Sequence, residues 1–240
     1  MKRIRLLLLI ILLSVLISSC NINRNSISEW YYPDWAVNAR YNQSIKVMDT
    51  ESALGRYALK TKEITLKDLA LIHGHLCDGL VISYIQIKAV LEKLFPDGIV
   101  DRTDLRAVSK NGPCWVDAIS TLTGTRTNFG TLSIQPEIGD GFIIQRISTG
   151  ESYSVHLKNG LFPKELTELE NKIRKAGAEK TGVNPEDIDK VEKMANNLSR
   201  KLLNSMPEEI LDIKKIDKYK FEFKFETAKR GDIINKDVSR

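Results

Sequence analysis

The chain has 240 residues, 42% of them hydrophobic, so it is long enough to bury a substantial core in one domain, with or without an appendage. Its formal net charge of +5 comes from 36 basic and 31 acidic residues, but residues 1–19 hold three of the basic ones and no acidic one. The rest of the chain is therefore almost neutral. Because it also lacks a basic block interleaved with aromatic residues, the sequence argues against nucleic-acid binding.

The N-terminus has the pattern of a bacterial lipoprotein signal. Basic residues at positions 2, 3 and 5 precede a nearly unbroken apolar run over residues 6–17, and Ser18-Ser19-Cys20 follows it. This run is shorter than the ~20 residues that span a bilayer, which disfavours the alternative of an uncleaved membrane helix. We predict a signal peptide over residues 1–19, membrane attachment through lipid on Cys20, and a location in the cell envelope outside the cytoplasm.

Residues 20–62 are predicted to form a lipid-anchored linker and an N-terminal arm. Residues 21–28 are typical of a short tether. The arm is rich in aromatic residues, namely Trp30, Tyr31, Tyr32, Trp35 and Tyr41. Because aromatic side chains bury large areas, we expect the arm to pack on the domain, and a ligand or partner platform is the alternative.

Two helices are predicted next. Thr65 and Asp68 form a capping-box pattern that opens a short helix and delivers His73. Gly74 and Gly79 bracket a break in the pattern. Residues 80–95 are then apolar on most sides, which predicts a largely buried helix.

The middle of the chain alternates strand and helix patterns. Residues 105–109 are predicted to form a strand, and Gly112-Pro113 starts a second short helix that ends near Gly124. Three further strands are predicted to form an antiparallel meander, over residues 130–135, 141–148 and 152–158.

Residues 159–240 are predicted to be a C-terminal extension of two helices and a hairpin. Pro163 and Pro185 each start a helix with apolar residues at helical spacing. Aromatic and charged residues alternate over residues 219–225, which predicts a strand, and residues 210–216 are expected to pair with it. The predicted fold class is α+β, with an antiparallel sheet packed against helices and this extension added.

Potential metal ligands gather in one short segment. His73, His75 and Cys77 lie within five residues, in a chain with only three His and three Cys, and Cys114 is the other sulfur of the predicted domain. Cys77 and Cys114 each stand at the start of a predicted helix, where the helix dipole favours the thiolate. Two thiolates and one imidazole suit Zn²⁺ or another late first-row transition metal, with an open fourth position. Since residues two apart cannot share a helical face, we expect one histidine to bind the metal and the other to orient ligand or substrate.

A disulfide between Cys77 and Cys114 is the main alternative, because export would place the chain in an oxidising compartment. The disulfide would leave the two histidines unexplained. His156 lies in a strand-like segment without acidic or sulfur neighbours, and we interpret it as an ordinary structural residue.

The two metal-ligand segments together resemble the signature of the formylmethanofuran dehydrogenase E-subunit family. The first segment is His-Gly-His-Leu-Cys-x-Gly-Leu over residues 73–80, and the second is Cys-x-Val-Asp-Ala-Ile-x-x-Leu-Thr-Gly-Thr over residues 114–125. The resemblance covers roughly residues 63–158 and implies an α+β core, often homodimeric, with a metal-binding cleft. It implies as site residues His73, His75, Cys77 and Cys114, with Asp117 and Thr123 nearby.

The chain departs from the family pattern at three points. Asp78 stands where the family usually has proline, residues 126–128 replace a stretch richer in glycine and lysine, and a C-terminal Cys-x-x-Cys zinc ribbon is absent. The sequence predicts an exported, lipid-anchored metal-binding protein that acts as an accessory, carrier or sensor for a metal, metallocofactor or small-molecule ligand. A small metalloenzyme is the alternative, with Asp117 as a candidate base beside a metal that activates water or polarises a carbonyl.

Overall fold

The structure is a computed structural model that describes residues 28–50, 52 and 60–225. The predicted signal peptide, Cys20 and the tether to residue 27 lie outside the described residues. The described helices are α2 Asp34–Val37, α3 Leu66–His73, α4 Asp78–Leu94, α5 Pro113–Thr123, α6 Lys164–Glu179, α7 Pro185–Asn204 and α8 Pro207–Ile210, with 3-10 turns η2 Thr127–Phe129 and η3 Pro136–Ile138. The described strands are β1 Ile45–Met48, β2 Lys62–Ile64, β3 Ile99–Asp101, β4 Leu105–Ser109, β5 Leu132–Ile134, β6 Gly141–Arg146, β7 Ser152–Leu157 and β8 Leu211–Lys215.

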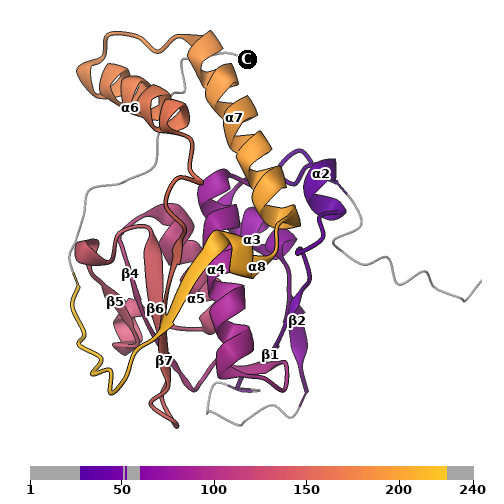
Figure 1. Cartoon of the computed structure of the whole chain (residues 1–240), viewed down its shortest axis with the longest axis vertical. Helices are drawn as coiled ribbons and strands as arrows, with labels where there is room; N and C mark the ends of the chain where they lie inside the picture. Colours follow the sequence, from indigo (N-terminus) through magenta and orange to yellow (C-terminus); the bar gives the residue numbers. More distant parts are fainter. Residues whose placement is uncertain (1–27, 51, 53–59, 226–240) are drawn as a thin grey trace, which may run out of the picture.

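Two mixed sheets and the helices between them confirm the predicted α+β class. The larger sheet has the order β5-β4-β6-β7-β8 and is antiparallel except where β4 pairs with β5. The smaller sheet has the order β2-β1-β3, with β1 and β3 parallel. Figure 1 shows the larger sheet on one side of α4 and strands β1 and β2 on the other.

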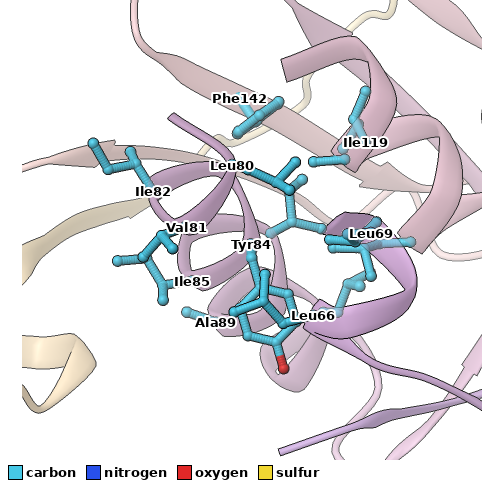
Figure 2. Packing of buried hydrophobic residues seen from close by; sticks show 14 of the residues in the cluster. Leu66, Leu69, Leu80, Val81, Ile82, Tyr84, Ile85, Ala89, Ile119 and Phe142 are labelled. Carbon is cyan, nitrogen blue, oxygen red and sulfur yellow. The ribbon is translucent and has the colours of Figure 1, made fainter. Parts of the chain in front are cut away.

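Helix α4 is the centre of the hydrophobic core, as its apolar sequence predicts. Leu80, Tyr84 and most other residues of α4 are buried. Figure 2 shows their side chains among those of Leu66 on α3, Ile119 on α5 and Phe142 on β6. Because α3 and α5 both pack on the N-terminal part of this helix, the ends of three helices meet at one place.

The break between α3 and α4 has a clear backbone cause. The predicted capping box forms, with the Asp68 amide donating to Thr65 Oγ1 and the Thr65 amide donating to the Asp68 carboxylate. Gly74 ends α3 in the left-handed conformation, with φ of +106°, which a residue with a side chain adopts only at a cost. The chain can therefore reverse direction within a few residues and start α4 beside the end of α3.

The N-terminal arm packs on the domain, as predicted. Tyr32 and Ala36 are fully buried, and the amide of Leu76 donates to the carbonyl oxygen of Tyr31 at 2.9 Å. This last bond ties the arm to the segment between α3 and α4. Trp30 is the exception among the aromatic residues, since it is 85% exposed.

The predicted meander is wrong at its first strand. β6 and β7 do form an antiparallel hairpin, but β5 pairs with β4, in parallel, at the edge of the sheet. The physical reason is the crossover through α5 and η2, which returns the chain to the starting end of β4 before β5 begins. Parallel neighbours need such a long connection, whereas a meander needs only tight turns.

The predicted C-terminal hairpin is also wrong. Strand β8 pairs with β7 instead of residues 219–225, and these residues reach the opposite edge of the larger sheet. There the amide of Ile134 donates to the carbonyl oxygen of Lys224 at 2.8 Å, and Phe223 and Phe225 stay exposed. Each segment satisfies the unpaired backbone groups of one sheet edge, which is a better use of its hydrogen bonds than pairing alone in solvent.

The two predicted C-terminal helices are present, and they differ in how they pack. Leu198, Leu202 and Leu203 of α7 are buried in the same hydrophobic core as α4. Helix α6 packs on α7 and buries only Leu166 and Ile173. In Figure 1, α6 and the first half of α7 project beyond the sheet. In the described part of the chain, no helix is both long and apolar enough to cross a membrane.

Candidate metal centre

Three helix ends present the candidate ligands. His73 is the last residue of α3, Cys77 is the N-cap of α4, and Cys114 lies in the first turn of α5. The Cys77 sulfur accepts a hydrogen bond from the amide of Leu80 at 3.4 Å. Both sulfurs therefore lie at helix N-termini, where the unpaired amides and the helix dipole stabilise negative charge.

The distances between the donor atoms match a tetrahedral metal site. His73 Nε2 lies 3.6 Å from Cys114 Sγ and 3.9 Å from Cys77 Sγ, and the two sulfurs are 3.4 Å apart. Metal–sulfur and metal–nitrogen bonds of about 2.3 Å and 2.05 Å at tetrahedral angles would put the sulfurs about 3.8 Å apart and each about 3.5 Å from the nitrogen. The site needs shifts of only a few tenths of an ångström to hold an ion. It is the only such group of three His, Cys, Asp or Glu ligands among the described residues.

Of the four predicted ligands, the structure brings these three together and leaves His75 outside the group. The His75 side chain is exposed, and its ring centroid lies 5.2 Å from that of His73 at an angle of 43°. Cys77 and Cys114 are both unbonded cysteines. The geometry therefore gives two sulfurs, one imidazole nitrogen and a fourth direction without a protein ligand from the described residues.

Asp117 is directly attached to this group. It follows Cys114 by three residues, so the two side chains lie on the same face of α5. His73 Nδ1 lies 2.8 Å from Asp117 Oδ2, and this hydrogen bond is the main reason why the pKa of His73 rises to about 9. The carboxylate stabilises the N–H on the far side of the ring from the sulfurs.

The two thiols are electrostatically coupled. The hydrogen bond between Cys77 and Cys114 raises the pKa of Cys77 to about 12, and burial adds to this shift. The same bond lowers the pKa of Cys114. Cys114 therefore takes the thiolate form more readily, and a bound cation would have to displace the proton that Cys77 holds.

Gly79 matters for the site in a way that the sequence analysis missed, because it treated this glycine only as the end of a break. A Cβ atom at Gly79 would lie 3.0 Å from the Cys114 sulfur and 3.2 Å from the Trp115 ring. The first turn of α4 can approach α5 this closely only because residue 79 has no side chain. The signal was the fixed position of the glycine two residues after Cys77.

The remaining candidate residues lie elsewhere. Thr123 is nine residues beyond Cys114 on α5, about 13 Å along the helix axis. It is buried, and its hydroxyl donates to the carbonyl oxygen of Ile119. His156 Nε2 lies 3.0 Å from the carbonyl oxygen of Ile138, and its ring fills the space next to Gly141 on the paired strand. Both residues have structural roles, as interpreted for His156 from the sequence.

Comparison with known proteins agrees with these motifs. The family model described as FmdE, molybdenum formylmethanofuran dehydrogenase operon, matches residues 72–212, which include both ligand segments. Among solved structures, the chain is similar to an FmdE-like protein of the tungsten formylmethanofuran dehydrogenase type from Syntrophus aciditrophicus. The two share 18% sequence identity, with a TM-score of 0.38, over 64% of this chain and 72% of that chain. No curated protein matches the sequence.

Proposed function

The chain belongs to the FmdE family, and on that premise we propose that it is a metal-binding protein whose single site is formed by His73, Cys77 and Cys114. The observation that carries the proposal is the set of three donor-atom distances, 3.4, 3.6 and 3.9 Å, which fits a tetrahedral ion. Thiolate and imidazole ligands suit Zn²⁺ or another late first-row transition metal over Ca²⁺ or Mg²⁺, which prefer oxygen.

An accessory, carrier or sensor role agrees better with this site than catalysis does. A metalloenzyme of this type needs a free base near the open coordination position. Asp117 was the candidate base, but its carboxylate is already hydrogen-bonded to His73 on the far side of the ring. The open position is therefore proposed to accept a ligand from solvent, from a small molecule or metallocofactor, or from a second protein.

Titration of the metal-free protein with Zn²⁺, read by competition with a chromophoric chelator, tests this function. We expect about one ion per chain and an affinity that falls as the pH is lowered. Binding releases protons from Cys77, whose pKa is raised to about 12, and from the His73 ring, whose pKa is raised to about 9. Protons therefore compete increasingly well below pH 9. A wild-type chain that binds no stoichiometric Zn²⁺ at any pH between 6 and 9 would contradict the proposal.

We also propose that the protein is exported, is anchored in the bacterial cell envelope by lipid on Cys20, and forms a homodimer. The support for export is the basic, apolar and small-residue pattern of residues 2–20. The support for the dimer is the family resemblance.

A Cys20→Ser substitution is expected to abolish lipid attachment and to move the protein out of the membrane fraction, because the described residues contain no spanning helix that would retain it. Cell fractionation followed by immunoblotting measures this change. Cys77→Ser is the matched control, since it also removes one sulfur but leaves the lipidation site. Equal membrane retention of the Cys20→Ser protein would remove the lipoprotein proposal.

A further inference from the structure

The relation between Asp117 and His73 gives Asp117 a role that the sequence does not assign. His73 belongs to α3 and Asp117 to α5, yet their side chains meet at 2.8 Å through Nδ1 and Oδ2. The His73 side chain is only 6% exposed, whereas that of Asp117 is 38% exposed. Asp117 thus reaches from the surface to the buried ring and holds it at one edge.

This contact decides which nitrogen of the ring can bind a metal. A neutral imidazole carries one N–H and one lone pair, and the lone pair is the metal ligand. A carboxylate can only accept a hydrogen bond, so Asp117 keeps the proton on Nδ1. The lone pair is then left on Nε2, the atom that faces Cys77 and Cys114 at 3.9 and 3.6 Å.

We propose that Asp117 is a positioning residue: it holds the N–H of His73 at Nδ1 and orients the ring so that Nε2 is presented to an ion between the two sulfurs. The inference rests on the proposed metal-binding function and goes beyond it, because it says how the third ligand is prepared before the ion arrives. Preparation of the ring lowers the ordering cost of binding and raises the basicity of Nε2.

The other neighbour of the ring cannot replace Asp117. His75 lies 5.2 Å away, centroid to centroid, in a tilted contact without a hydrogen bond between the rings. Among the described residues, Asp117 is the hydrogen-bond partner of Nδ1. Removal of its carboxylate should therefore free the ring to rotate and to place its proton on either nitrogen.

The test compares the full mature chain with its Asp117→Asn and Asp117→Ala variants. Zinc affinity is measured by chelator competition, and the position of the His73 proton is read from the ¹⁵N–¹H spectrum of the metal-free protein above the pKa of the ring. Asp117→Ala is expected to weaken zinc binding by roughly 10–100-fold at unchanged stoichiometry. The Ala variant should also show His73 with substantial proton occupancy on Nε2.

Asp117→Asn should lose less affinity than Asp117→Ala, because the Asn carbonyl oxygen still accepts from Nδ1–H. Asp140→Ala is the charge control: it removes an exposed carboxylate that pairs with Lys110 and should leave both readouts unchanged. Wild-type affinity in Asp117→Ala, or a His73 proton that stays on Nδ1 without the carboxylate, would overturn the inference. If wild type itself binds no zinc, the proposed function fails, while the spectrum of the metal-free protein still decides the role of Asp117.

Discussion

Replacing Cys77 or Cys114 with serine is expected to remove nearly all bound metal from the protein. A serine hydroxyl is not ionised at neutral pH and is a poor zinc ligand, so each variant keeps only two effective donors. Four-ligand structural zinc sites bind with about 10–16 kcal/mol, or roughly 3 kcal/mol per ligand, which predicts a loss of affinity on the order of 100-fold. Metal content per chain after gel filtration, together with chelator competition, measures the loss.

The two histidines provide a matched comparison for this prediction. His73→Ala should lose metal as the cysteine variants do, because it removes the only imidazole within reach of both sulfurs among the described residues. His75→Ala should keep metal near the wild-type level, since His75 is exposed and lies outside the ligand group. Retention of stoichiometric metal by Cys77→Ser or Cys114→Ser, or equal losses in the two histidine variants, would show that the ligand set is wrong.

Truncation after Lys158 is expected to lower the thermal stability sharply and to cause aggregation. The truncated chain loses β8, so the backbone groups of β7 become an unpaired sheet edge. It also loses the α7 side chains that cover α4, which leaves buried residues of α4 exposed to solvent. Thermal unfolding followed by circular dichroism, beside the full mature chain, measures the effect.

Leu202→Ala is the more limited version of the same test. Leu202 is fully buried in the core, so the substitution should cost about 2–5 kcal/mol of unfolding free energy while it leaves β8 in place. Lys201→Ala, which changes an exposed neighbour on the same helix, should have an effect within about 0.5 kcal/mol. A truncated domain that melts with the full chain and binds zinc equally well would make the extension an independent appendage.

The parts of the structure that the sequence predicts are those with short-range physical causes. The capping box of Thr65 and Asp68, the left-handed Gly74 and the apolar sequence of α4 act within a few residues of themselves. They place His73 and Cys77 on either side of a tight break. The prediction that only one of the two histidines joins the sulfurs follows from the same local geometry, and the structure gives His73 that position.

The parts that the sequence does not predict depend on long-range competition. Whether Leu211–Lys215 pairs with residues 219–225 or with β7 depends on which sheet edge is open, and no local pattern reports that. The parallel pairing of β4 with β5 likewise follows from the crossover through α5. Asp117 was predicted as a base because its sequence neighbours do not show that His73, 44 residues earlier, is its hydrogen-bond partner.

The central claim is that Cys77 and Cys114 bind a metal and do not form a disulfide in the exported protein. The most direct measurement combines elemental analysis of the protein purified from its native envelope with thiol titration of the same sample under denaturing, metal-chelating conditions. We expect about one transition-metal ion per chain, most often zinc, and two titratable thiols from Cys77 and Cys114. A metal-free protein in which both cysteines are oxidised would contradict the account.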